Sequence, residues 1–306
     1  MIELIIQVSI LILSLIVLAI ASHFTIKYVE NLIMLTGLSE ASVGFAILAV
    51  MTSTPEIAVA LFSAIQGTPG ISVGDVLGSN VFNISMIIGI LATLGYLKKC
   101  RKDLMIKLTD ILILTSIIPF ILILFNMASR FVGALLLGIF AFNIFIMTRK
   151  RTPSVDEPLT VHNKLVTVLM VIIGVAIVIL AARFAVSSAV NIAITFGVPP
   201  ITIGAKIVAI GTSLPELSLD LTAARRGRIQ LALGDIIGSN LTNLTLVLGL
   251  LLISSPFTVD ISTFAEIIPF VLITTVIFWR YLTKGYISQT VGITLILLYV
   301  LFQAIF

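Results

Sequence analysis

The sequence predicts an all-α membrane protein with ten transmembrane helices in two inverted five-helix repeats. Three observations favour this fold. The 306 residues are 59% hydrophobic and 10% charged, the apolar residues form runs of membrane-spanning length, and one polar motif occurs twice at a fixed separation. Soluble domains are about 25% charged. Lipid is therefore the main solvent of this chain, and its functional residues must lie in or between helices.

Apolar runs separated by polar residues, glycine or proline predict the ten helices, each long enough for a bilayer core about 30 Å thick. They cover residues 3–33, 41–65, 71–96, 106–126, 130–148, 164–195, 201–223, 230–253, 263–282 and 286–305. Residues 149–163 carry two prolines and several charges, which is typical of a linker. The predicted domains are a first repeat over 1–148, a cytoplasmic linker over 149–163 and a second repeat over 164–306.

The basic residues predict how the chain crosses the membrane. With ten alternating spans, nearly all loop lysines and arginines fall on one side, among them Lys98, Arg101, Lys150 and Arg226. The positive-inside rule makes this side cytoplasmic, so both termini are expected outside the plasma membrane. These loops account for the net charge of +4, and no nucleic acid, cofactor or obligatory protein partner is predicted. A single cysteine, Cys100, excludes an internal disulfide or a Cys-based metal cluster.

The two halves of the chain are copies of one another. Met51–Gly89 aligns with Gly211–Gly249 at a constant shift of 160 residues without a gap, and the identities include both Pro-Glu pairs and both Gly-Ser-Asn triplets. Because an odd number of predicted spans separates the copies, they enter the membrane from opposite sides. Inverted repeats of this kind place a substrate site near the bilayer midplane and provide alternating access to it.

The first part of the repeated motif reads Thr-Ser-x-Pro-Glu, over Thr52–Glu56 and Thr212–Glu216. Proline has no N–H, so each motif is expected to break its helix and to free the carbonyl four residues earlier, that of Met51 or Gly211. Hydroxyls, carbonyls and a carboxylate form an all-oxygen ligand set, which suits hard cations such as Ca²⁺ and Na⁺.

Glu56 and Glu216 are the central candidates for cation binding. A carboxylate at the bilayer centre costs at least about 2.5 kcal/mol and is functional by default. Two such groups without basic partners need a cation or protons, and their two charges match one Ca²⁺.

The second part of the motif places two polar stripes on otherwise apolar helices. They consist of Asp75, Ser79 and Asn83 in one copy and Asp235, Ser239 and Asn243 in the other. For the two aspartates, two roles stay open: cation binding, or capping of the N–H groups at a helix start. The neighbouring glycines are expected to allow close helix packing.

These paired motifs resemble the α-repeats of the Ca²⁺/cation antiporter superfamily, in particular the prokaryotic sodium/calcium exchangers. The resemblance covers essentially the whole chain. It implies that Glu56 and Glu216 are the main Ca²⁺ ligands and that the first and sixth helices slide across an eight-helix core. It further implies oxygen ligands, mostly for Na⁺, from Thr52, Ser53, Thr212, Ser213, Ser79, Ser239, Asn83 and Asn243, and from the backbone carbonyls of Ala49 and Ala209.

Several positions depart from the family pattern or from the internal symmetry. Met51 replaces a usual glycine, which Gly211 retains, so the two helix breaks are expected to differ in shape. Asn83 and Asn243 are both amides, although some relatives carry an aspartate at the second position. Lys206 either extends outward to the interface or is a tethered cation near the site. Asp220, whose counterpart is Ala60, is expected to be an inner-vestibule charge near Arg225.

The rival functions are a proton/Ca²⁺ exchanger, a cation channel and, more remotely, an intramembrane aspartyl protease. Proton-coupled relatives usually carry Gly-Asn-x-x-Glu in place of Thr-Ser-x-Pro-Glu, so the hydroxyls here favour Na⁺. Asp75 and Asp235 could form a protease pair, but their place in an internal repeat that also carries glutamates favours ion binding. Inverted repeats with broken helices favour a carrier over a channel. The sequence therefore predicts an antiporter and not an enzyme.

Overall fold

The computed structural model describes residues 2–66, 69–98, 103–118, 121, 128–148, 164–195, 209–254 and 261–305, and this part of the chain is helical apart from short connections. The first half contains α1 (Ile2–Thr36), α2 (Glu40–Val43), η1 (Gly44–Leu48), α3 (Ala49–Thr52), α4 (Thr54–Gln66), α5 (Pro69–Val81), η2 (Phe82–Ile87), α6 (Ile88–Thr93), α7 (Asp103–Ser116) and α9 (Arg130–Thr148). The second half contains α10 (Lys164–Thr195), α12 (Ala209–Thr212), α13 (Leu214–Arg225), α14 (Ile229–Thr242), η4 (Asn243–Val247), α15 (Leu248–Ser254), α16 (Ile261–Lys284) and α17 (Gln289–Ile305).

Six of the described helices are long and apolar enough to cross a membrane, or seven if the bent pair α2–α3 and α4 forms one span. The number of ten spans is not confirmed. Helices α7 and α17 have only 14 and 17 residues, and the first eight residues of the helix predicted over 201–223 lie outside the described residues. The predicted linker over 149–163 also lies outside them, so the repeat boundaries and their opposite orientation stay predictions.

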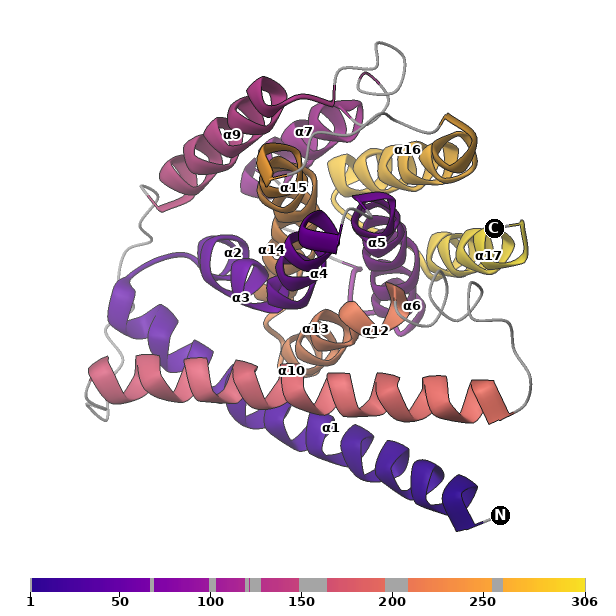
Figure 1. Ribbon diagram of the computed structural model, residues 1–306. Coiled ribbons are helices and arrows are strands. Elements are labelled where there is room, and N and C mark those ends of the chain that lie inside the picture. Colours follow the sequence, from indigo (N-terminus) through magenta and orange to yellow (C-terminus); the bar gives the residue numbers. More distant parts are fainter. Residues whose placement is uncertain are drawn as a thin grey trace.

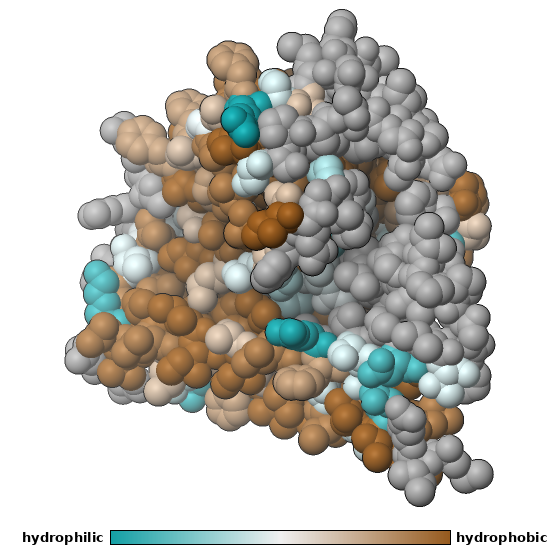
Figure 2. Space-filling model, viewed as in Figure 1, coloured by the Kyte–Doolittle hydropathy of each residue, from teal (hydrophilic) through white to brown (hydrophobic). Residues whose placement is uncertain are grey.

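The helices separate into an inner group and an outer group. In the apolar 18-residue stretch of each candidate span, 83% of the residues are buried for Ser72–Thr93 and for Ile229–Ser254, against 12% for Leu4–Thr36. Helices α1 and α10 expose large apolar side chains along their length, such as Leu13, Ile16 and Ile172. Apolar residues dominate the described surface in Figure 2. An apolar outer surface of this extent matches a lipid environment.

Helices α1 and α10 form a crossed pair along one edge of the bundle (Figure 1). Gly174 of α10 lies directly against the side chain of Thr25 of α1, and a Cβ atom at Gly174 would overlap the Thr25 hydroxyl. Small residues permit such close helix crossings in membranes. The long helices predicted over 3–33 and 164–195 are thus confirmed, and they pack against one another.

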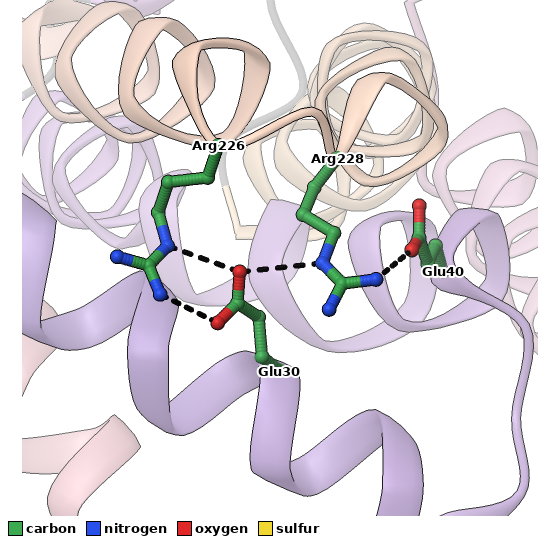
Figure 3. A network of polar contacts seen from close by, with 4 residues as sticks. All are labelled: Glu30, Glu40, Arg226 and Arg228. Atoms are coloured by element: carbon green, nitrogen blue, oxygen red, sulfur yellow. Dashed lines mark hydrogen bonds and ion pairs between the residues drawn. The ribbon is translucent and has the colours of Figure 1, made fainter.

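A network of ion pairs joins the end of α1 to the turn between α13 and α14 (Figure 3). Arg226 donates two hydrogen bonds to Glu30, of 3.0 and 2.7 Å. Arg228 donates to Glu30 at 3.2 Å and to Glu40 at 2.8 Å. Gly227 between the two arginines has φ +79°, a left-handed conformation that lets the chain reverse there. The hydrogen bonds to Glu30 raise the pKa of Arg226 above its usual value, so this arginine stays charged at any physiological pH.

The two sequence copies also share their local structure. The helix before each break covers Ala49–Thr52 or Ala209–Thr212, and the helix after it begins at Thr54 or Leu214. Each copy then has a long helix that passes into a π-helical segment, η2 or η4. The sequence did not predict these π-helical segments, which are frequent at functional sites. Because both copies keep them, they belong to the repeated unit.

Candidate cation-binding site

The helix breaks lie at Ser53 and Ser213, as the two Thr-Ser-x-Pro-Glu motifs predict. Ser53 has φ −75° and ψ 9°, and Ser213 has φ −94° and ψ 5°, so neither residue is in helical conformation. In the first copy the helix axis bends by 42° at the break. Glu56 and Glu216 follow in the first turn of the next helix, and both are 0% exposed. Proline two residues after each break is the local cause.

The two breaks differ in hydrogen bonding. The amide of Ser53 donates to the carbonyl of Ala49 at 3.0 Å, four residues back, and the Thr52 hydroxyl donates to the same carbonyl at 3.3 Å. The amide of Ser213 donates instead to Ile210, three residues back, at 3.2 Å. The expectation that the breaks differ in shape is therefore confirmed. The Ala49 carbonyl, a predicted ligand, is already an acceptor of two hydrogen bonds.

One expectation about free carbonyls is wrong. The Thr54 hydroxyl donates to the carbonyl of Met51 at 2.7 Å and replaces the N–H that Pro55 lacks. The equivalent position in the second copy is Leu214, which has no hydroxyl. The sequence signal was present, because threonine often hydrogen-bonds a nearby backbone carbonyl. Only Gly211 is left as a candidate for the freed carbonyl.

Three buried carboxylates interact electrostatically inside the molecule. The charge of Glu56 interacts with those of Glu216 and Asp75, and Glu216 also interacts with Asp75. None of the four oxygens of the two glutamates has a partner that meets the geometry of a hydrogen bond. Among the described residues, no lysine, arginine or histidine is buried. Unpaired buried charges of one sign are costly, so this site requires cations or protons.

Hydroxyl groups from opposite halves of the chain surround these carboxylates. The Thr212 hydroxyl donates to Asp75 at 3.0 Å and lies 3.4 Å from that of Ser79. Thr52 lies 3.3 Å from Ser239 in the matching arrangement. Thr212 also lies beside Glu56, and Thr52 and Ser239 lie beside Glu216. The motifs therefore form one site, in which each half contributes to the surroundings of the other half's glutamate.

The buried Oγ atoms of Ser53 and Ser213 have no hydrogen-bond partner. Both side chains are fully buried. A buried hydroxyl usually finds a partner, so these two atoms are available as further oxygen ligands at the breaks.

Four asparagines form a crossed network between the halves. Asn83 donates its amide N–H to the side-chain oxygen of Asn240 at 3.0 Å, and Asn243 donates to that of Asn80 at 3.2 Å. Asn80 also donates to the backbone carbonyl of Asn240 at 3.2 Å. The side-chain oxygens of Asn83 and Asn243 are left buried and unpaired. The network thus fixes these two amides with an oxygen free for a cation.

Asp75 and Asp235 are equivalent in sequence but not in surroundings. Both lie more than one turn inside their helices, α5 and α14, and both are buried, so the helix-capping role is wrong. Asp75 accepts the hydrogen bond from Thr212. Asp235 lies instead beside Asp220, whose side chain is 0% exposed, whereas Arg225 is exposed. The expectation of Asp220 as a vestibule charge near Arg225 is also wrong, because its helix face is turned into the protein.

The glycines of the second copy pack as expected, because a Cβ atom at Gly234 or Gly238 would meet the backbone of Ala41 or Phe45 within 3 Å. This close contact holds α14, with Asp235 and Ser239, against the segment before the first break. Gly74 has no atom within 4 Å of an added Cβ, so the packing explanation does not hold there.

The structure gives little information on two of the predicted site residues, Lys206 and Ala209. Lys206 lies outside the described residues, and of Ala209 only the backbone is described, at the start of α12. The described residues contain no group of three or more His, Cys, Asp or Glu placed to share a metal ion. A cation here would thus depend on two carboxylates and on neutral oxygens.

The sequence interpretation missed Asn80 and Asn240 as orienting residues, although both belong to the Gly-Ser-Asn identities of the repeat.

Comparison with known proteins identifies the family. The profile of the sodium/calcium exchanger protein family matches residues 6–149 and 166–306. The sodium/calcium exchanger MaX1 of Methanosarcina acetivorans is 27% identical, with 97% of each chain covered. A protein named as an antiporter, CaxA of Alkalimonas amylolytica, is 34% identical over 73% of each chain.

A solved structure of the sodium-calcium exchanger NCX_Mj has the same fold. It superposes with a TM-score of 0.84 and 25% sequence identity, covering 98% of this chain and 99% of that one. These relatives are transporters, which excludes the protease alternative. The chain belongs to the sodium/calcium exchanger protein family, and it is a membrane-embedded cation/Ca²⁺ antiporter rather than an enzyme.

Proposed function

We propose that this antiporter exchanges Ca²⁺ for Na⁺ at a single central site, with Glu56 and Glu216 as the main Ca²⁺ ligands. The observation that carries the proposal is the pair of fully buried glutamates, one from each half, whose oxygens have no hydrogen-bond partner. Ca²⁺ takes six to eight oxygen ligands and accepts irregular geometry. One Ca²⁺ compensates both charges, and the neutral oxygens nearby complete its shell.

The remaining oxygens are assigned to Na⁺ and to completion of the Ca²⁺ shell. They come from hydroxyls, from the two oriented amides and from carbonyls at the breaks, namely Thr52, Ser53, Ser79, Thr212, Ser213, Ser239, Asn83, Asn243, Ala49 and Ala209. The charge of Asp75 interacts with those of both glutamates, but in the described part of the chain the three carboxylates are not placed to share one ion. Because Asn83 and Asn243 are neutral, the centre carries fewer charges to compensate than it would with an aspartate at either position.

Exchange follows from the charge requirement of the site. When Ca²⁺ leaves, the two glutamates cannot both stay ionised without replacement cations, since buried like charges repel strongly. The density of hydroxyl and amide oxygens supports Na⁺ as that replacement, and NCX_Mj and MaX1 are both named as sodium/calcium exchangers. Protons are the alternative counter-ion, because the same carboxylates can bind them.

Alternating access is assigned to the outer pair α1 and α10 moving against the inner helices. The lipid-facing surface of α1 supports this assignment. The polar contacts of α1 with the inner helices include the Glu30 ion pairs near its end and the 2.7 Å contact between the Ser22 and Ser218 hydroxyls. The positive-inside rule assigns the turn at Arg226 and Arg228 to the cytoplasm. Together with the predicted ten spans, this assignment supports both termini outside the plasma membrane.

The test is ⁴⁵Ca²⁺ uptake into proteoliposomes loaded with Na⁺, with K⁺-loaded vesicles and an imposed pH gradient as comparisons. Uptake driven by the Na⁺ gradient alone is the expected result. Uptake driven only by the pH gradient would move the protein to proton/Ca²⁺ exchange, and flux that persists without any counter-ion would indicate a channel.

A further inference from the structure

A second pair of buried carboxylates lies beside the central site. Asp220 of α13 and Asp235 of α14 are both 0% exposed. Their charges interact with one another, and the charges of both interact with that of Glu216. Asp220 follows Glu216 by four residues, which places it one helical turn, about 6 Å, farther along α13.

This second pair has no donor to satisfy it. None of the four carboxylate oxygens of Asp220 and Asp235 has a hydrogen-bond partner, and no basic side chain is buried in the described part of the chain. Two carboxylates this close cannot both be ionised without a positive charge between them. The two aspartates therefore need a bound cation or a shared proton, just as the central glutamates do.

The internal symmetry sets this pair apart from the exchange machinery. The counterpart of Asp220 in the first half is Ala60, which is also buried. The counterpart of Asp235 is Asp75, which accepts a hydrogen bond from Thr212 at 3.0 Å and so has a partner. Only the second half thus assembles two unpartnered carboxylates at this level. Packing alone does not require a carboxylate at position 220, since alanine fills the equivalent position in the other copy.

We propose that Asp220 and Asp235 form a second cation site that binds a divalent ion of the Ca²⁺ class. Their two charges compensate one divalent ion, and carboxylate oxygens are the ligands that Ca²⁺ prefers. Along α13 the pair lies between Glu216 and the turn that carries Arg226 and Arg228. An ion bound by this pair would lie between the central site and that turn. This inference goes beyond the exchange reaction and does not depend on whether the counter-ion is Na⁺ or a proton.

The experiment counts bound Ca²⁺ by equilibrium dialysis with ⁴⁵Ca²⁺ on the purified full-length protein in detergent, in Na⁺-free buffer. The expected result is two Ca²⁺ per chain for the wild type and one for Asp220→Asn. Asp235→Asn must lose the same single ion, which guards against a folding defect specific to one variant. Glu56→Gln should lose the central ion and retain the second one. Asp110→Asn removes an exposed carboxylate and should still bind two.

A wild type that binds one Ca²⁺, with the number unchanged in Asp220→Asn, would overturn the inference; a proton shared by the two aspartates gives that result. Loss of both ions in a folded Asp220→Asn would also overturn it, because Asp220 would then act only through the central site. Absence of Na⁺-driven uptake in a protein that binds two Ca²⁺ would refute the proposed exchange and leave the second site standing.

Discussion

The charge of the central glutamates is the feature whose removal has the most predictable effect. Glu56→Gln and Glu216→Gln keep the shape of a fully buried side chain and delete one of two charges that face a cation. Removing one partner of a buried ion pair costs about 3–5 kcal/mol. Since about 1.4 kcal/mol corresponds to a factor of ten, Ca²⁺ affinity should fall roughly a hundredfold to several thousandfold.

Two measurements check this prediction. At a Ca²⁺ concentration near the wild-type dissociation constant, ⁴⁵Ca²⁺ uptake by either variant in Na⁺-loaded proteoliposomes should fall to a few per cent or less. Calorimetric titration of the same preparations should give the matching loss of affinity. Asp110→Asn, in which the carboxylate that accepts the Trp279 N–H at 2.7 Å is neutralised, is the charge-matched control and should transport normally. More than a few per cent of wild-type flux in both glutamate variants would refute the two-carboxylate site.

Three further substitutions test other parts of the site. Pro55→Ala should reduce uptake less than the glutamate variants, because it only partly restores the helix; an effect as large as theirs would contradict this. Asn240→Ala removes the acceptor that orients Asn83. The Na⁺ concentration that gives half-maximal uptake should therefore rise several-fold. An unchanged Na⁺ concentration dependence would exclude the orienting role. Glu30→Arg should slow ion exchange by breaking the ion pair with Arg226. The charge-swapped double variant Glu30→Arg/Arg226→Glu should restore the rate of ion exchange. A rate that is not restored would indicate that this ion pair is unimportant.

Helix positions with strong sequence signals were predicted closely. The helices predicted over 130–148 and 164–195 have the same bounds in the structure. Each begins at a basic residue and is predominantly apolar, so few alternative boundaries existed. The bend at Ser53 was likewise predictable, because a proline within an apolar run has few other consequences.

Contacts that depend on the association of the two halves were not predictable. Asn80 and Asn240 lie off the polar stripe of their own helices, so helical spacing gave them no role, and only the crossed hydrogen bonds reveal it. The surroundings of Asp220 were missed for a related reason. Its counterpart is Ala60, so comparison of the copies gave no information, and the partner Asp235 lies on a different helix.

The hydrogen bonds between side chains of the site, such as Thr52 with Ser239 and Asn83 with Asn240, connect one half of the chain to the other. This has a consequence for biosynthesis. During translation the first half enters the membrane while the ligands of the second half do not yet exist, so Glu56 must wait in lipid either protonated or beside water. Ca²⁺ can stabilise only the completed chain. A transporter truncated after its first half would therefore carry an unsatisfied carboxylate, which gives membrane quality control a physical signal that distinguishes unfinished chains from finished ones.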